Sequence, residues 1–132
     1  MSKKSEVVKI FESAAREAGK LINKEFGKVT DSKVQSKDLG DFVTNTDLET
    51  ENILLNILRK HFPNSSYLTE ESDPFKGNDE TIVIDPIDGT SNFIHGIPSI
   101  GIVIARVHKD EITDGIIFNS VSDELFFATK DK

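Results

Sequence analysis

The N-terminal part of the chain carries apolar residues at the spacing of one helical face. Residues three and four apart lie on the same side of a helix, so this pattern predicts an amphipathic helix. Ser5 is a good capping residue for its start, and Gly27 is placed to end it. The polar stretch 29–40 is then expected to be a loop. The apolar positions of the helix are Val7, Ile10, Phe11, Ala14, Ala18, Leu21 and Ile22.

A second helical pattern begins at Thr46. The run Thr46-Asp47-Leu48-Glu49 has the form of a capping box, in which the side chains of Thr46 and Glu49 satisfy free amides at a helix start. Pro63 ends the pattern, because proline cannot continue a helix. The expected apolar stripe consists of Ile53, Leu54, Ile57, Leu58 and Phe62.

Beyond Pro63 the apolar residues occur in short runs rich in β-branched side chains, which predicts strands. These runs are Tyr67–Leu68, Thr81–Ile84, Ile100–Val107, Ile112–Phe118 and Leu125–Ala128. The connections near 108–110 and 119–123 are short enough for antiparallel hairpins. The order predicts an α+β fold, with two N-terminal helices packed on a mainly antiparallel sheet. Nothing is left to cover the other face of the sheet, so the chain either belongs to a larger unit or buries that face against a partner.

The composition is that of an ordinary soluble globular chain, with 132 residues, 36% hydrophobic and 30% charged. The net charge of −7 argues against nucleic acid as a partner, because no basic excess can displace counterions. The chain has no cysteine, which excludes disulfides, thiolate metal sites and a cysteine nucleophile. We find no secretory signal and no apolar stretch long enough to span a bilayer, so we expect a cytoplasmic protein without a membrane partner.

A dense polar group follows the strand predicted at Thr81–Ile84, namely Asp85-Pro86-Ile87-Asp88-Gly89-Thr90-Ser91. Two nearby carboxylates repel each other unless a proton or a cation lies between them, and oxygen ligands suit a hard cation such as Mg²⁺. If residues 89–91 begin a helix, their amides can bind an anion such as phosphate. A cation site beside an anion site is what phosphoryl chemistry requires.

Each of these acidic residues also has a purely structural explanation. Asp85-Pro86 and Asp88-Gly89 are good turn formers, and Asp47 suits the first turn of a helix through the helix dipole. The pair Glu70-Glu71 follows a short predicted strand and could simply be solvated. The functional signal therefore lies in the order and spacing of the three segments together.

These segments resemble the inositol monophosphatases, the Mg²⁺-dependent and Li⁺-sensitive phosphomonoesterases related to fructose-1,6-bisphosphatase. Residues 84–98 follow the metal-binding signature of that family almost throughout. Leu68–Ser72 is similar to its Gly-Glu-Glu element, and Lys37–Asp47 matches its Asp-x-Val-Thr-x-x-Asp segment with a preceding lysine. The resemblance covers the whole chain and implies the N-terminal half of the layered α/β sugar-phosphatase fold. Residues 1–132 are then a single N-terminal metal-binding domain, and the C-terminal half is absent.

The resemblance implies a set of metal ligands. Glu70, Asp85 and the backbone carbonyl of Ile87 hold a first Mg²⁺. Asp85 and Asp88 hold a second, with Asp85 bridging the two ions. The resemblance further implies two or three ions in a complete site, and inhibition by Li⁺.

The resemblance also implies the catalytic and substrate-binding groups. Thr90 orients the attacking water, Asp47 accepts the Thr90 proton, and Glu70 belongs to the same catalytic set. The amides of Gly89 and Thr90 hold the phosphate. The substrate-binding set as a whole is Ile87, Asp88, Gly89 and Thr90.

The reaction implied is Mg²⁺-dependent hydrolysis of a phosphomonoester resembling inositol monophosphate, by in-line attack of a metal-activated water. The expected partners are a small phosphorylated substrate and, since family members are commonly homodimers, a second copy of the chain. Two alternatives remain open. One is a different member of the superfamily, such as a bisphosphate nucleotidase or a fructose bisphosphatase. The other is an inactive truncated domain that acts only as a binding or dimerisation module.

Overall fold

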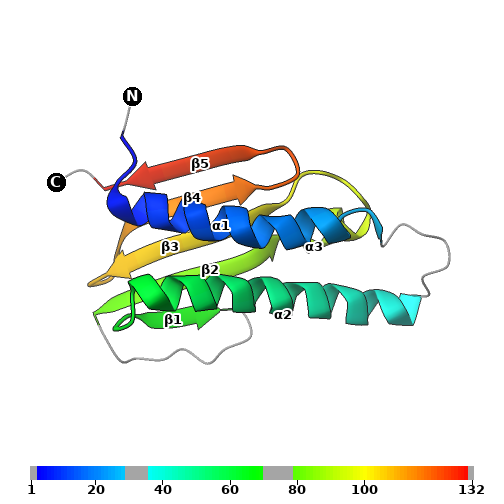
Figure 1. Ribbon diagram of the computed structural model, residues 1–132, viewed down its shortest axis with the longest axis horizontal. Coiled ribbons are helices and arrows are strands. Elements are labelled where there is room, and N and C mark those ends of the chain that lie inside the picture. The colour runs from blue at the N-terminus through cyan, green and yellow to red at the C-terminus, as the bar shows by residue number, and fades with distance from the viewer. Residues whose placement is uncertain (1–2, 29–35, 70–78, 131–132) are drawn as a thin grey trace.

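A computed structural model describes residues 3–28, 36–69 and 79–130 of the chain. Two long helices come first and are followed by five strands and one short helix (Figure 1). In chain order the elements are α1 (Glu6–Glu25), α2 (Ser36–His61), β1 (Ser66–Thr69), β2 (Glu80–Asp88), α3 (Thr90–Ile94), β3 (Gly101–His108), β4 (Glu111–Asn119) and β5 (Glu124–Thr129).

The first helix forms as its sequence predicts. Ser5 is the N-cap, and its hydroxyl accepts a hydrogen bond from the amide of Val8 (3.1 Å). The helix ends at Glu25, and Gly27 follows with a φ of +85°, a backbone conformation that glycine adopts without strain. The predicted boundaries of this helix are therefore confirmed.

The predicted start of the second helix is wrong. Helix α2 begins at Ser36, so residues 36–40 are helical where a loop was expected, and Thr46 lies inside the helix where a cap was expected. Thr46 and Thr50 are buried, and the Thr50 hydroxyl donates to the Thr46 carbonyl (2.7 Å). Together with Leu54 and Leu58 they form one buried stripe at a spacing of four residues. The first two members of this stripe are threonines. A search for hydrophobic residues at helical spacing does not include threonine, so the stripe was predicted to begin later.

The strands occur at all five predicted places and form one sheet in the order β1-β2-β3-β4-β5. β1 runs parallel to β2, and every other neighbouring pair is antiparallel. Lys109 and Asp110, between β3 and β4, both have positive φ, at 48° and 67°. Positive φ at both central residues is the geometry of a two-residue type I′ hairpin turn. The α+β class and the mainly antiparallel sheet are confirmed.

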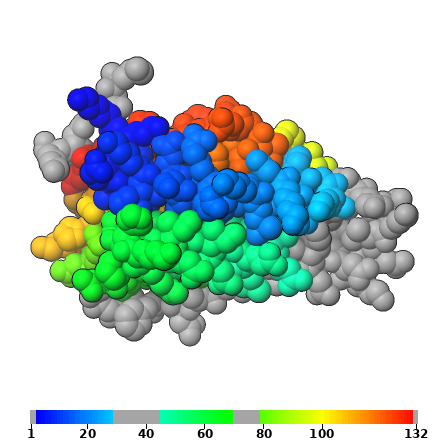
Figure 2. Space-filling view, viewed as in Figure 1, coloured from blue at the N-terminus to red at the C-terminus, as the bar shows by residue number. Residues whose placement is uncertain are grey.

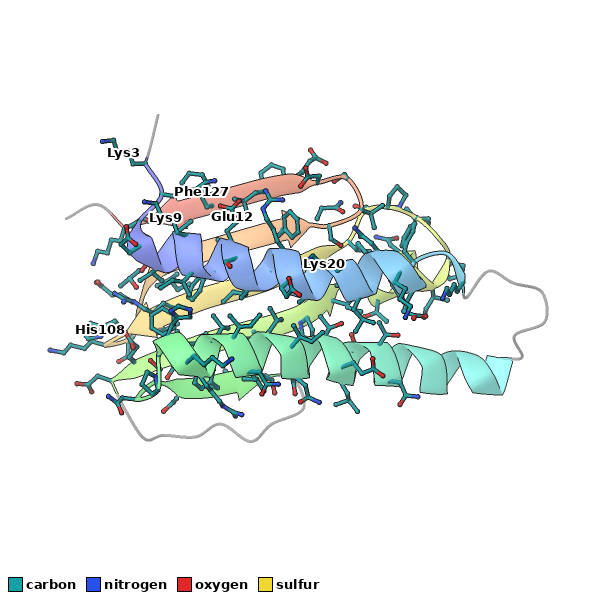
Figure 3. The ribbon with its side chains drawn as sticks, in the orientation of Figure 1. Lys3, Lys9, Glu12, Lys20, His108 and Phe127 are labelled. Carbon is teal, nitrogen blue, oxygen red and sulfur yellow. The ribbon has the colours of Figure 1, made fainter. Side chains whose placement is uncertain are left out.

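Helices α1 and α2 lie side by side on the same face of the sheet (Figures 1 and 2). The start of α1 is fixed to β4 by Asp114, a buried carboxylate that accepts from the Ser5 hydroxyl (2.8 Å) and pairs with Arg106 (3.5 Å). The ammonium of Lys4 lies over the ring of Phe127, which Figure 3 shows on β5 beside the first turns of α1. The largest fully buried apolar side chains of the core are Phe11, Phe93, Ile22, Leu54, Leu58, Ile82, Ile84, Ile102, Ile104 and Val8.

The opposite face of the sheet is apolar. Ile112, Ile117 and Phe126 are exposed by 66%, 47% and 59%, and they line a groove of about 580 Å³ together with Val103 and Ala105. This agrees with the expectation that the two helices leave one face of the sheet without cover. Within the described residues, no helix is long and apolar enough to cross a membrane.

Tyr67 supplies a direct test of the packing between α2 and β1. Its hydroxyl donates to the Phe62 carbonyl (2.8 Å). Burial raises the pKa of Tyr67 to about 12; the positive charge of Arg59 acts to lower this pKa, and the negative charge of Glu80 acts to raise it. It is the only tyrosine and the chain has no tryptophan, so absorbance at 295 nm follows this group alone. We expect a midpoint near pH 12 in pH-jump titrations of the folded chain, and near 10 in urea.

The same shift gives a pH dependence of stability. The unfolded chain releases the Tyr67 proton near pH 10 and the folded chain retains it to about 12. The contribution of Tyr67 to stability is therefore complete below pH 10 and is lost as the pH rises to about 12. Tyr67→Phe removes this alkaline phase and serves as the control. A folded-state midpoint near 10 would show that the phenol is solvated.

Candidate functional site

The polar group singled out by the sequence lies at the C-terminal end of β2. Residues three apart in a regular strand face opposite sides of a sheet. Pro86 and Ile87 are both buried, however, and the pairing with β3 is irregular between Asp85 and Asp88. The alternation thus slips by one residue, and Asp88 returns to the side of the strand on which Asp85 lies. This irregularity places the two carboxylates on the same side of the strand.

Gly89 turns the chain from β2 into the short helix α3. It is the N-cap residue with φ +90° and ψ 40°, the left-handed region that glycine adopts readily. The amide of Phe93 donates to the Gly89 carbonyl (3.0 Å), and the Phe93 side chain is fully buried. Residues 90–94 are helical, which confirms that the hydroxyl residues after Gly89 open a helix.

Two of the predicted site residues are in direct contact. The hydroxyl of Thr90 donates to the backbone carbonyl of Ile87 (3.3 Å). The resemblance implies that the Ile87 carbonyl is a metal ligand and that Asp47 accepts the Thr90 proton. A carbonyl oxygen has two lone pairs, so the hydrogen bond leaves one of them for a cation.

The remaining predicted residues come from other segments. Asp47 is half-buried within α2, which contacts both β2 and α3, the elements that carry Asp85, Asp88 and Thr90. Glu70 lies outside the described residues, so its assignment stays a prediction. No group of three or more acidic or histidine side chains able to hold a metal occurs among the side chains that the structure describes, those of residues 3–28, 45–69 and 79–130.

The donors at this end of β2 nevertheless fit a hard cation. They are two carboxylates and one backbone carbonyl, all oxygen ligands, and the chain offers no thiolate. Asp88 is exposed and Asp85 half-buried, so a hydrated ion could reach them without displacing the core. Mg²⁺ keeps several waters when bound, which suits a site with few protein ligands.

The sequence did not reveal what supports the turn from outside. The loop between α3 and β3 packs against Gly89, and the side-chain amides of Asn92 and Asn119 donate to its carbonyls at Ser99 and Pro98 (both 2.8 Å). Asn92 lies within the signature run. Asn119, at the end of β4, carried no signal beyond its place as the first residue of the connection predicted at 119–123.

Substitution at Gly89 tests how tightly this turn is held. A Cβ at residue 89 would lie 2.9 Å from the Ser99 carbonyl oxygen, in addition to the left-handed φ. Gly27 has a similar φ but nothing within 4 Å of its Cβ position, so Gly27→Ala is the matched control. We expect Gly27→Ala to cost about 1–2 kcal/mol in urea unfolding from the φ alone, and Gly89→Ala to cost more. Equal losses would show that the loop near Ser99 yields freely.

Comparisons with known proteins show the family of the chain. The model of the inositol monophosphatase family matches residues 3–132. An inositol-1-monophosphatase of Caulobacter vibrioides is 38% identical over 122 residues, which are 90% of this chain and 48% of the relative. The Nus factor SuhB of Pasteurella multocida is 37% identical over 119 residues, which are 89% of this chain and 45% of the relative. The crystal structure of the extragenic suppressor protein SuhB of Bartonella henselae matches with a TM-score of 0.80 and 35% identity, over 95% of this chain and 48% of that one.

The chain therefore spans about half the length of the curated relatives it matches. The residues that the family model matches, 3–132, include β2, the Gly89 turn and the strands that follow. A family match over nearly the whole chain, with the same fold in a solved relative, leads to one conclusion. The chain belongs to the inositol monophosphatase family.

Proposed function

We propose that this chain is the metal-binding half of a phosphomonoesterase that hydrolyses an ester resembling inositol monophosphate with Mg²⁺. The observation that carries the proposal is the slip in β2, since it brings Asp85 and Asp88 to one side of the strand directly before the Gly89 turn. Family membership supports the phosphatase class. The name of the Caulobacter relative supports the substrate class.

The carboxylates of Asp85 and Asp88 and the carbonyl of Ile87 would hold the cation, and Glu70 is proposed to complete the set. When bound, Mg²⁺ neutralises charge on the phosphoryl oxygens and acidifies water. A complete site would hold two or three ions, and Li⁺ would inhibit.

Thr90 is proposed to orient the attacking water. Its own proton is engaged by the Ile87 carbonyl (3.3 Å), so Thr90 Oγ1 can accept a hydrogen bond from the water. Asp47 is proposed to accept the Thr90 proton and so to help activate that water, for which the Thr90 hydroxyl would turn from the Ile87 carbonyl toward Asp47. The amides of Gly89 and Thr90 are proposed to bind the phosphate, beside the carbonyl of Ile87 and the carboxylate of Asp88.

Release of inorganic phosphate tests the proposal. The 132-residue chain is assayed with an inositol monophosphate, a bisphosphate nucleotide and fructose 1,6-bisphosphate, each with and without Mg²⁺. Mg²⁺-dependent release from the first substrate, absent in Asp88→Asn, supports the proposal as stated. Preference for another substrate assigns the chain to a bisphosphate nucleotidase or fructose-bisphosphatase type. No release, together with no binding of Mg²⁺, leaves the inactive binding or dimerisation module.

A second candidate comes from the relatives named Nus factor SuhB, one of them 37% identical to this chain. The charge of −7 makes direct binding to nucleic acid unfavourable, so such a role would rest on protein contacts. A homodimer also stays a prediction, and sedimentation of the purified chain tests it.

A further inference from the structure

The wall of the Gly89 turn is a piece of backbone from elsewhere in the chain. The loop that joins α3 to β3 brings the Ser99 carbonyl oxygen within 2.9 Å of the position that a Cβ on Gly89 would occupy. The Cα of Ile100 lies 3.5 Å from the same position. The backbone of this loop therefore occupies the space that a side chain at residue 89 would need.

Side-chain amides hold that loop in place. Asn92 Nδ2 donates to the Ser99 carbonyl (2.8 Å), and the Ile97 amide donates to the Asn92 carbonyl (2.8 Å). Asn92 belongs to α3 and takes part in both of these bonds. The bonds therefore move with the turn and do not fix it to the rest of the chain. The anchor from outside is Asn119 at the end of β4, whose Nδ2 donates to the Pro98 carbonyl (2.8 Å).

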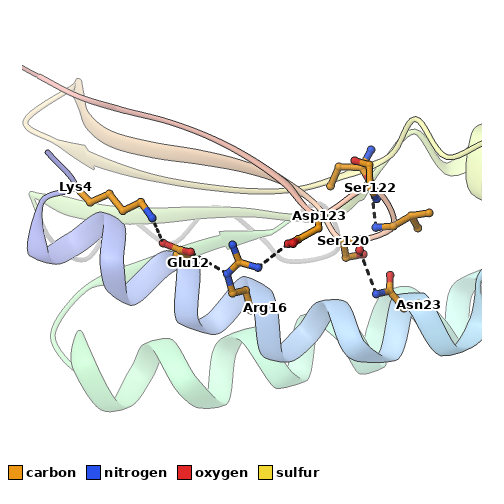
Figure 4. Close-up of polar contacts among 9 residues, drawn as sticks. Lys4, Glu12, Arg16, Asn23, Ser120, Ser122 and Asp123 are labelled. Carbon is orange, nitrogen blue, oxygen red and sulfur yellow. Dashed lines mark hydrogen bonds and ion pairs between the residues drawn. The ribbon is translucent and has the colours of Figure 1, made fainter. Parts of the chain in front are cut away.

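The orientation of the Asn119 amide is itself fixed. Its Oδ1 accepts from the amides of Val121 and Ser122 (both 3.1 Å) in the turn between β4 and β5. An acceptor that is already engaged by two donors forces Nδ2 to the other side, where the Pro98 carbonyl lies. That β4–β5 turn is also bound to α1, because Asn23 donates to the Ser120 carbonyl (3.1 Å) and Arg16 pairs with Asp123 (2.7 Å) (Figure 4).

We propose that Asn119 is a positioning residue for the metal-binding turn. It connects the end of β4 to the loop at Pro98 and Ser99, and this loop holds Gly89 and the start of α3 in position. The proposal rests on the proposed function, because it takes Asp85–Ser91 to be the metal site. It assigns a role to a residue outside the signature run, 21 positions beyond its last residue, Pro98.

The test uses a variant that separates the two bonds of the amide. Asn119→Asp keeps an acceptor for Val121 and Ser122 but removes the donor to Pro98. Asn23→Asp is the matched control, since it removes an asparagine donor to the same β4–β5 turn without touching the loop. Two readouts are recorded on the full 132-residue chain by NMR. One is hydrogen exchange of the amides of Phe93 and Ile97, which donate to Gly89 and Asn92. The other is a Mg²⁺ titration followed at residues 85–91.

We expect exchange at both amides to rise roughly three- to tenfold in Asn119→Asp, the range for loss of one hydrogen bond. The Kd for Mg²⁺ should rise by a similar factor, and Asn23→Asp should change neither quantity. Unchanged exchange in Asn119→Asp overturns the proposal, and so does an equal rise in Asn23→Asp. If amide exchange in Asn119→Asp is faster but its Kd for Mg²⁺ is unchanged, Asn119 does not position the turn for metal binding, and that part of the proposal is overturned. If the wild-type chain binds no Mg²⁺, the proposed function fails, and exchange alone decides whether Asn119 positions the turn.

Discussion

Asp88→Asn is expected to remove most of the thermal stabilisation that Mg²⁺ gives to the wild-type chain. A ligand that binds only the folded state stabilises it by about 2.7 kcal/mol at 100 times its Kd. A hundredfold loss of affinity leaves about 0.4 kcal/mol at the same concentration. Asp88 is exposed and makes no ion pair with another described residue, and its charge repels that of Asp85, so stability without Mg²⁺ should not fall.

Asp79→Asn is the matched control for this substitution. Asp79 is also exposed and lies next to β2, but at the opposite end of the strand, and it loses the same charge. Differential scanning calorimetry with and without Mg²⁺ measures all three proteins. If Asp88→Asn retains the full wild-type shift, Asp88 is not a ligand. If both variants lose the Mg²⁺-dependent rise in Tm equally, the effect comes from the net charge of the protein.

Phe93→Ala is expected to cause the largest loss of stability, about 3–5 kcal/mol, the range for removing a fully buried phenylalanine. Phe93 is 0% exposed and packs edge-on against Phe26 at the end of α1, with 6.2 Å between the ring centroids. For a chain of this size the loss corresponds to a fall in Tm of roughly 10–20 °C. Because Phe93 anchors α3, the Gly89 turn should lose order together with the core.

Two further variants make this prediction specific. Phe126→Ala removes the same side chain from the open face of the sheet, where it is 59% exposed, and should change stability by less than about 0.5 kcal/mol. Phe93→Leu should recover most of the loss, since it refills the cavity. Urea unfolding measures all three. Similar losses for Phe93→Ala and Phe126→Ala would contradict the packing described for α3.

The sequence predicted those parts of the fold that depend on local chemistry. The Ser5 cap and the apolar stripe of α1 are visible as residue types at fixed spacing, and so are the strands and the short hairpin connection near residues 108–110. The type I′ geometry of Lys109 and Asp110 was not predicted. The start of α2 was missed because Thr46 and Thr50 are buried, although threonine reads as a polar, capping residue. Their burial depends on packing between α2 and its neighbours, which local spacing does not describe.

For the candidate site, too, local features could be predicted from the sequence and long-range contacts could not. Its residue types and order were evident in the run from Asp85 to Ser91, but the geometry that relates them was not. The slip at Pro86 and Ile87 depends on pairing with β3, and the hydrogen bond from Asn119 to Pro98 joins residues 21 positions apart. Contacts of this kind depend on the assembled sheet.

The order of the strands has a consequence for how the chain folds. Strands β2 to β5 lie in the sheet as they follow one another in sequence, so each pairing closes only a short loop. Helix α1 instead meets the sheet through contacts such as Ser5 with Asp114 and Arg16 with Asp123, 109 and 107 residues apart. The entropy of loop closure adds about 0.6 kcal/mol for each doubling of loop length, so these contacts carry the largest closure term. The strands can therefore assemble early from local hairpins, and docking of α1 completes the core.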